Sequence, residues 1–195
     1  MILDALEKLL RDTALRDLGV EEIAQSAHIT RTRFYHYYKS KYEAYAALLR
    51  RVAAEAINLS DLPGAWFDRP ESVSPRESLF ATMRGMKNVW FEHQAVLREA
   101  SDLWNAVPEV REGWFEIING LIDRTRTAIE LERERGVAPP GPDAQRLAES
   151  LIWHGERTQF LIFINAPGAL APDDLVDMTS WIWLRTIYLS DDPKL

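Results

Sequence analysis

The 195-residue chain contains no cysteine, so disulfide bonds, thiolate metal sites and cysteine nucleophiles are excluded. It also has no long hydrophobic run, because runs such as Phe160–Ile164 are far shorter than a bilayer span. No basic and apolar leader precedes the first acidic residue, Asp4. We therefore expect a soluble cytoplasmic protein that does not associate with a membrane.

The sequence has few features of an enzyme. Its four histidines are scattered, and it has no glycine-rich phosphate-binding loop. Asp173–Asp177 matches the DDxxD pattern of prenyl-diphosphate enzymes, but after Pro172 it is better explained by acids in the first turn of a helix. His154 and Glu156 resemble the start of a deaminase zinc motif whose cysteines are missing. We expect no catalytic residue, no metal and no cofactor.

Apolar residues recur at three- to four-residue spacing along the chain, and we find no convincing strand pattern. Together with capping residues, glycines and prolines, this spacing predicts an all-α fold with nine helices and no internal repeat. The expected helices span about residues 2–14, 20–27, 30–37, 40–59, 75–92, 94–104, 108–136, 143–165 and 172–189. A loop at residues 60–74, with Pro63, Gly64 and Pro70, separates two regions.

Local signals mark several helix ends. In the capping box Ser40–Glu43, we expect Ser40 to accept from the Glu43 amide while the Glu43 carboxylate reaches back to the Ser40 amide. Ser74–Glu77 is a second capping box, with proline at the first helical position. Gly136 is the expected residue after the end of the long helix at 108–136.

The formal net charge is −7, which argues against a general polyanion binder, but the charge is unevenly distributed. Residues 28–45 hold four basic side chains against one acidic one, a balance of +3, so the rest of the chain carries −10. The same segment holds five of the six tyrosines, whereas all seven tryptophans lie from Trp66 onward. One end is therefore suited to a charged partner that forms hydrogen bonds, and the other to bulky apolar contacts.

Residues 19–41 have the dimensions of a helix-turn-helix whose turn is Ala27–Ile29. Phe34 and Tyr38, at i,i+4, are expected to face inward, so the first turn of the second helix presents polar residues outward. That turn is where readers of the DNA major groove carry base-contacting side chains. A helical hairpin whose tyrosines only fill a core is the alternative. The DNA-binding candidates are Thr30, Arg31, Thr32, Arg33, Tyr37 and Lys41, of which Tyr37 and Lys41 are suited to phosphates.

The motif Ile23-Ala24-x-x-Ala27-His28-Ile29-Thr30-x-x-x-Phe34-Tyr35-x-Tyr37-Tyr38-x-Ser40-Lys41 closely resembles the signature of TetR-family transcriptional regulators. The rest of the chain is similar to the ethionamide-repressor (EthR) branch of that family, in Leu131–Pro139, Glu156–Thr158, Ile182-Trp183 and Ile187-Tyr188. The resemblance implies a DNA-binding domain at residues 1–45 and a ligand-binding and dimerisation domain at 46–195. It also implies that the candidates above, together with Tyr35, occupy or adjoin DNA-contacting positions.

Two features depart from the family pattern. His28 stands at a turn position where the family usually has glycine, and we expect the turn to persist with some strain, because histidine tolerates left-handed backbone better than most residues. The usual basic arm before the first helix is absent, which should weaken non-specific phosphate contacts.

Seven tryptophans make a poorly packed solid core, so their abundance after Trp66 favours an apolar ligand chamber, although aromatics at helical spacing usually form core. By the resemblance, the chamber residues are Phe80, Met83, Trp90, Trp114, Ile118, Leu121, Thr125, Ile152, Gly155, Phe160 and Trp183. The EthR branch has asparagines where Ile152 and Gly155 stand here, so the ligand should differ. We expect a neutral or weakly polar, elongated lipophilic effector.

The last helix carries Trp181, Leu184 and Tyr188 on one face and further apolar residues on another, and the helix before it contains the apolar run 160–164. A terminal helix that is apolar on two sides has to bury one of them against a partner. We therefore expect a homodimer through the eighth and ninth helices, with an enclosed monomer as the alternative.

These features predict a homodimeric repressor that binds a pseudo-palindromic DNA operator and is released by a small lipophilic effector. The alternative function is a carrier of small lipophilic molecules that never touches DNA. Only the DNA-binding protein should lose affinity for a polyanion steeply as salt rises.

Overall fold

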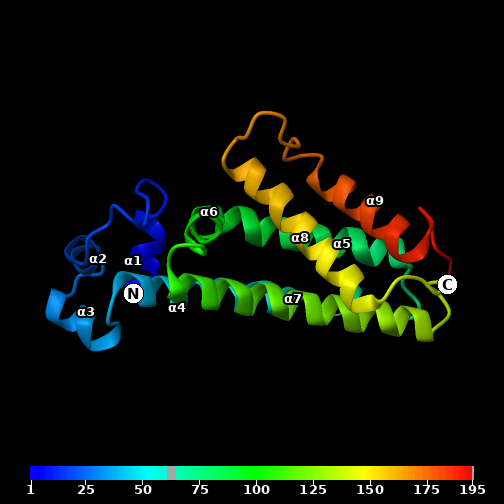
Figure 1. Cartoon of the computed structure of the whole chain (residues 1–195), viewed down its shortest axis with the longest axis horizontal. Helices are drawn as coiled ribbons and strands as arrows, with labels where there is room; N and C mark the ends of the chain where they lie inside the picture. The colour runs from blue at the N-terminus through cyan, green and yellow to red at the C-terminus, as the bar shows by residue number, and fades with distance from the viewer. Residues whose placement is uncertain (61–64, 195) are drawn as a thin grey trace. The chain divides into compact units, whose positions relative to one another are not determined.

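The computed structural model describes residues 1–60 and 65–194, with no side chains described for 56–60 (Figure 1). Its helices are α1 (Ile2–Leu9), α2 (Val20–Ser26), α3 (Arg31–Tyr37), α4 (Lys41–Ser60), α5 (Pro75–Glu92), α6 (Gln94–Leu103), α7 (Pro108–Glu134), α8 (Ala144–Phe163) and α9 (Leu175–Tyr188). The described residues contain no strand, so the prediction of nine helices in an all-α fold is confirmed. A 3-10 turn at Trp66–Asp68 lies within the expected loop, whose Pro63 and Gly64 fall outside the described residues.

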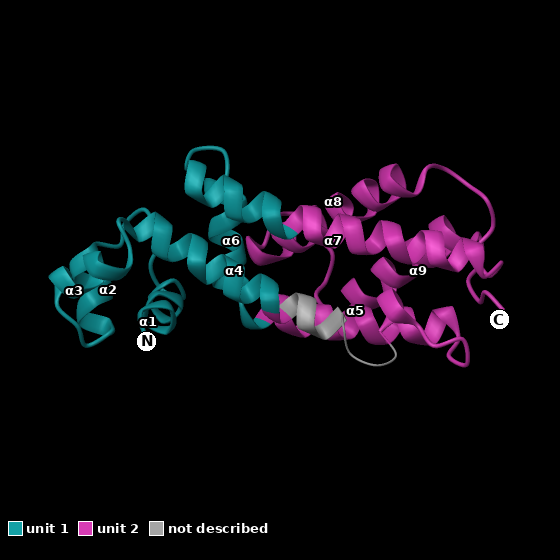
Figure 2. Ribbon diagram, turned by 90° about the horizontal axis from the view of Figure 1, so that it is seen from below, with its two compact units in different colours: residues 1–54, 92–117 teal, residues 55–91, 118–195 magenta. Residues whose placement is uncertain are grey.

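The chain forms two compact units, which Figure 2 shows in different colours. Unit 1 consists of residues 1–54 and 92–117, and unit 2 of residues 55–91 and 118–195. Unit 1 thus contains α1 to α3, most of α4, α6 and the first part of α7. No helix among the described residues is both long and apolar enough to span a membrane.

Helix α1 ends at Leu9, several residues before the expected end near residue 14. The chain tightens there, because the amides of Arg11 and Asp12 bond the carbonyls three residues earlier instead of four. The amide of buried Leu15 then donates to the carboxylate of Glu99 in α6 (2.8 Å). The amphipathic pattern could not reveal this partner, because it lies 84 residues away in sequence.

The capping box at the start of α4 forms in part. The Glu43 amide donates to the Ser40 hydroxyl oxygen (3.1 Å), as predicted. The Glu43 carboxylate, however, accepts from the amide of Lys39, so the expectation that it bonds Ser40 is wrong. It reaches one residue further back, to the bend at Lys39 and Ser40 that follows the extended residue Tyr38.

A buried polar network holds one end of unit 2. The guanidinium of Arg69 donates to both carboxylate oxygens of Glu132 (2.8 and 2.9 Å), and both side chains are buried. Glu132 also accepts from the Tyr188 hydroxyl (2.8 Å), which in turn accepts from the indole N–H of Trp66 (2.8 Å). Burial, followed by the charge of Glu132, raises the pKa of Tyr188 far above its ordinary value, so Tyr188 stays a neutral donor.

The ends of the last three helices follow from short-range chemistry. Gly136 has a φ of 73°, a left-handed conformation that favours glycine, and its amide bonds the Arg133 carbonyl, as expected for the residue after α7. Asp143 caps α8 by accepting from the Arg146 amide (3.0 Å). Helix α9 begins at Leu175 and not at Pro172 as predicted, because the residues after the proline form a turn first.

Candidate DNA-binding surface and ligand cavity

The turn between α2 and α3 is a Schellman motif built around His28. The Ile29 amide donates to the Ala24 carbonyl (2.9 Å) and the His28 amide to the Gln25 carbonyl (3.0 Å). His28 has a φ of 54°, in the left-handed region. The prediction that this turn forms with histidine in place of glycine is therefore confirmed, and the strain lies in the backbone of one residue.

Replacing His28 by glycine should stabilise the protein by up to about 1 kcal/mol, because glycine adopts a positive φ without steric cost. The matched control is Gln25→Gly on the exposed side of α2, which should cost about 1 kcal/mol because its backbone is helical. Thermal unfolding of the two variants measures the difference. A lower midpoint for His28→Gly would mean that the imidazole makes a contact that outweighs the strain.

Helix α3 is oriented by its cap and by one buried ring. The Thr30 hydroxyl oxygen accepts from the Arg33 amide (3.2 Å), which fixes the first turn. Phe34 is fully buried, and its ring lies 5.9 Å from that of Tyr38. With this face inward, the first turn of α3 points to solvent, as the i,i+4 spacing predicts.

The structure leaves most of the DNA-binding candidates exposed, namely Thr30, Arg31, Thr32, Arg33, Tyr35 and Tyr37. The Arg31 guanidinium donates to the Tyr35 hydroxyl (3.5 Å), which raises the pKa of Arg31 above its ordinary value. Among the described residues, the side chain of Arg33 makes no ion pair or hydrogen bond. The tip of α3 is therefore a solvent-facing cationic surface.

Lys41 is arranged differently from the other candidates. Its ammonium donates to the carbonyls of Arg16 (2.7 Å) and Leu18 (2.8 Å), in the segment between α1 and α2. An ammonium has three donors, so one remains for a phosphate. Lys41 thus ties the start of α4 to the α1–α2 segment, a structural contact that sequence reasoning did not anticipate.

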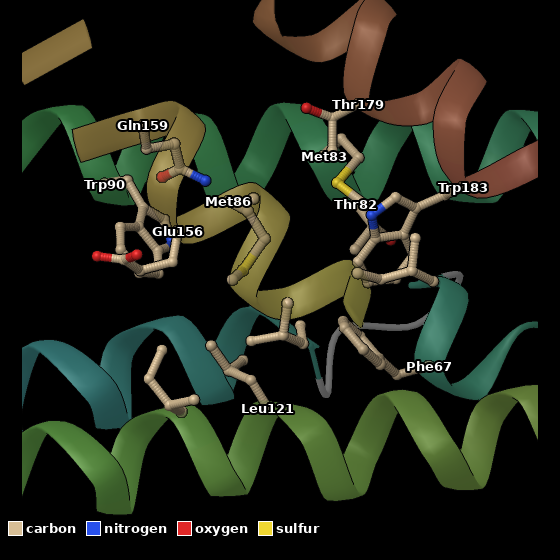
Figure 3. Close-up of a pocket in the computed structure, with 14 residues that line it drawn as sticks. Phe67, Thr82, Met83, Met86, Trp90, Leu121, Glu156, Gln159, Thr179 and Trp183 are labelled. Carbon is tan, nitrogen blue, oxygen red and sulfur yellow. The ribbon is translucent and has the colours of Figure 1, made fainter. Parts of the chain in front are cut away.

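Unit 2 contains an apolar cavity of about 60 Å³ (Figure 3). It is lined by α5, α7, α8, α9 and the segment at Phe67. Of the residues expected in a ligand chamber, the structure brings together Met83, Trp90, Ile118, Leu121, Ile152, Gly155 and Trp183.

Four expected chamber residues do not line this cavity. Phe80 packs edge-on against Trp181 with ring centres 6.0 Å apart, and Phe160 lies under the guanidinium of Arg157. Thr125 is fully buried away from the lining, and Trp114 belongs to the core of unit 1. These positions follow from helix rotation and packing, which residue identity alone does not specify.

Sequence reasoning missed half of the lining. The additional residues are Phe67, Thr82, Met86, Leu151, Glu156, Gln159 and Thr179. Met86 lies three residues after Met83, and Leu151 lies four residues before Gly155. Met83 and Gly155 were both expected in the chamber, so a stricter helical projection finds their neighbours on the same face. The polar residues carry no such signal, because polar side chains are ordinarily assigned to the solvated face of a helix.

Helices α8 and α9 lie side by side (Figure 1). Two residues of the apolar face expected at a dimer contact, Leu184 and Tyr188, are buried within the chain, and Trp181 is half-buried. The large apolar side chains that remain exposed on this helix pair are Leu161 and Met178, with Ile164 at the end of α8 and Leu189 at the end of α9. A surface depression beside Leu161 and Met178 measures about 290 Å³.

Two family models match the chain. Residues 2–48 match the model for bacterial regulatory proteins of the tetR family, and residues 79–189 match the C-terminal domain of the transcriptional regulator EthR. The HTH-type transcriptional regulator EthR of Mycobacterium tuberculosis (strain ATCC 25618 / H37Rv) is 33% identical over 96% of this chain and 85% of its own length. The regulator of the same name from Mycolicibacterium smegmatis is 30% identical over 96% and 84%.

The chain belongs to the TetR family of transcriptional regulators. Solved structures agree on the fold. Regulatory protein TetR from Rhodobacter sphaeroides has a TM-score of 0.72 at 21% identity, covering 95% of this chain and 96% of that one. A tetR-family transcriptional regulator from Streptomyces coelicolor has a TM-score of 0.72 at 18% identity, covering 95% and 78%.

Family membership confirms several expectations from the sequence. TetR-family regulators are ligand-responsive, DNA-binding repressors that dimerise, and they are not enzymes. The resemblance to the EthR branch is confirmed, and the alternative of a carrier that never touches DNA is disfavoured. The matching residues 2–48 include the whole helix-turn-helix and the start of α4.

Proposed function

We propose that this protein is a cytoplasmic homodimeric repressor that binds a pseudo-palindromic operator and releases it when a small lipophilic molecule enters the cavity of unit 2. The observation that carries the DNA-binding part is the exposed cationic first turn of α3. Residues 1–45 act as the DNA-binding domain, and residues 46–195 bind the effector and dimerise.

In the DNA complex, the first turn of α3 enters the major groove. Arg31 and Arg33 can each donate two hydrogen bonds to a guanine edge, and Thr32 can bond a base or pack on a thymine methyl. The Tyr37 hydroxyl, on a side chain that is 53% exposed, and the third donor of Lys41 suit the flanking phosphates. Thr30 fixes the turn, and Tyr35 holds the Arg31 guanidinium in place.

A dimer supplies the second α3 that a pseudo-palindromic operator requires, about 34 Å from the first. We place the interface on the outer faces of α8 and α9, where Leu161, Ile164 and Met178 are exposed. Exposed apolar side chains clustered on adjacent helices are typical of such an interface. A two-fold axis there lets the same patch bury itself.

The size of the cavity suggests how a ligand acts. A cavity of roughly 150 Å³ holds a molecule as small as benzene, whereas this one measures about 60 Å³. An elongated lipophilic molecule must therefore enlarge it, and the flexible side chains of Met83 and Met86 allow this. The ligand then binds the enlarged state more tightly than the closed one, which is the condition for shifting a population.

The helices α4 and α7 give this change a route, because each contributes residues to both compact units. We propose that enlargement of the cavity displaces α4, whose first residue is Lys41. The two copies of α3 in the dimer then no longer match successive major grooves, and the DNA is released.

Filling the cavity with Gly155→Trp tests the ligand-binding part. A Cβ at Gly155 would meet no other described side chain within 4 Å, so the indole can extend into the cavity. We expect the variant either to lose response to ligand while still binding DNA, or to be released permanently. Footprinting of the DNA upstream of the gene for this protein, with and without a lipophilic extract of the host cell, measures both.

The matched control is Gly85→Trp, another half-buried helical glycine with open space around it that does not line the cavity. It should leave the response to ligand unchanged. If Gly155→Trp responds as the unmodified protein does, the effector site lies elsewhere. If the unmodified protein protects no DNA, the proposed repressor function fails.

A further inference from the structure

Two neutral side chains in the lining of the cavity each hold a buried polar atom with no hydrogen-bond partner among the described residues. The atoms are Oε1 of Gln159 on α8 and the indole nitrogen of Trp183 on α9. We propose that the effector is a neutral lipophilic alcohol with an ether or carbonyl oxygen further along its chain. This inference rests on the proposed function, and it narrows the neutral or weakly polar lipophile expected from the sequence to one chemical class.

Gln159 is the partner of the hydroxyl group. Its side chain is half-buried, and its Oε1 atom is closed off from solvent without a donor from any described residue. A buried acceptor without a donor is costly, so a ligand that supplies a donor is favoured. A hydroxyl group suits a primary amide in either of the two orientations of the amide, because a hydroxyl both donates and accepts.

Trp183 is the partner of the second oxygen. It is only 4% exposed, and its indole N–H can donate but not accept. The ring packs edge-on against Trp66, with ring centres 5.5 Å apart, and the indole N–H of Trp66 donates to the Tyr188 hydroxyl (2.8 Å). The donor of Trp183 is therefore held in place. An oxygen that only accepts, as in an ether or a carbonyl group, is its matching partner.

The two partners lie at different ends of the cavity. Figure 3 shows Gln159 at the end near Trp90 and Trp183 at the end near Thr82, with Met86 between them. Hydrocarbon suits the apolar middle of the cavity, because polar groups placed there would lose their hydration without gaining a partner. The two polar groups of the ligand are therefore separated by a hydrocarbon segment.

Two other polar residues of the lining are already engaged. Glu156 pairs with Arg157 (3.7 Å) and makes a further interaction within the protein, so we assign its charge no contact with the ligand. The Thr82 hydroxyl oxygen accepts from the Trp66 amide (2.8 Å). An ionic ligand would lose its hydration here without an available counter-charge, which favours a neutral one.

Calorimetric titration of the full-length protein with three probes of equal chain length tests the proposed class. ω-Methoxydecanol carries both polar groups, dodecanol lacks the ether oxygen, and methyl undecyl ether lacks the hydroxyl group. Removing either group makes the probe more hydrophobic, so a cavity that is only apolar would bind ω-methoxydecanol least tightly. We expect the opposite order. ω-Methoxydecanol should bind about three- to tenfold more tightly than each of the others, the factor of one net hydrogen bond.

Two substitutions should each remove one preference. Gln159→Met keeps the length of the side chain without the amide, so methyl undecyl ether should then bind at least as tightly as ω-methoxydecanol. Trp183→Phe should have the same effect for dodecanol. The probes are compared within each variant, so a change in the shape of the cavity largely cancels. Gln145→Met, at another half-buried position of α8 that does not line the cavity, should leave both preferences unchanged.

The outcomes separate this inference from the proposed function. The inference is overturned if ω-methoxydecanol is not the tightest binder of the unmodified protein, if dodecylamine binds more tightly than dodecanol, or if the preferences survive Gln159→Met and Trp183→Phe. If the expected order holds but no probe releases operator DNA, the ligand class stands and the proposed function fails. If no probe binds, or if Gly155→Trp still binds all of them, the cavity is not a ligand site and both are overturned.

Discussion

Replacing Glu132 by glutamine should lower the free energy of unfolding by about 3–5 kcal/mol. The substitution keeps the shape of the side chain but leaves the fully buried guanidinium of Arg69 without its counter-charge. The Tyr188 hydroxyl also loses a charged acceptor. In a chain of this length, the expected fall in the thermal unfolding midpoint is roughly 10 °C.

Two controls identify the cause. Glu149→Gln breaks an exposed ion pair with Arg146 (3.0 Å) and should cost less than about 1 kcal/mol. The double variant Arg69→Met/Glu132→Leu should cost less than Glu132→Gln alone, because it removes both buried charges together. If the free energy of unfolding of Glu132→Gln lies within 1 kcal/mol of that of the unmodified protein, water reaches Arg69 and the network does not stabilise the fold.

Truncating Arg31 or Arg33 to alanine should weaken binding to the operator by about five- to 150-fold each, the usual effect of losing a base-contacting side chain. Both lie in the exposed first turn of α3, where a guanidinium can reach a guanine edge. Tyr37→Phe removes one hydroxyl and should have a smaller effect, about three- to tenfold. Fluorescence anisotropy with the footprinted operator measures these losses.

The salt dependence of binding separates the roles of these residues. Loss of a phosphate contact reduces the slope of log affinity against log salt by about 1, whereas loss of a base contact relaxes sequence preference at one position. Arg146→Ala, the same charge loss on an exposed residue of α8 in unit 2, should leave both unchanged. Equal operator affinity for Arg31→Ala, Arg33→Ala and the unmodified protein would refute the assignment of α3 as the reading helix.

Local chemistry explains why much of the helix-turn-helix could be predicted. The cap at Thr30, the turn at His28 and the inward Phe34 depend on residues within a few positions of one another. Backbone sterics and side-chain spacing act over the same short range, so these features can be read from the chain directly. Contacts between residues far apart in the sequence could not be predicted in this way. Lys41 was expected to be free for phosphate, but two carbonyls more than twenty residues away occupy two of its three donors.

The ligand chamber was predicted less completely than the helix-turn-helix. Apolar composition indicated that a cavity should exist among the later helices, and about half of the residues that line it are ones that the family resemblance named. The polar lining was missed, because Glu156 and Gln159 resemble solvated positions in a helical projection. Phe80 and Thr125, which the resemblance placed in the chamber, do not line this cavity, because a resemblance in sequence does not fix the rotation of a helix against its neighbours.

The amino-acid sequence alone thus determined the nine-helix architecture, the capped reading helix and its positive charge, since each depends on neighbours close in the chain. Only the tertiary structure decided that Arg69, Glu132, Tyr188 and Trp66 form one buried network, and that a carboxylate lies inside the apolar cavity. The physical reason is that burial is a property of the packed chain. A charged residue is solvated or buried according to which helices, distant in sequence, pack over it. No local sequence pattern indicates which helices these are.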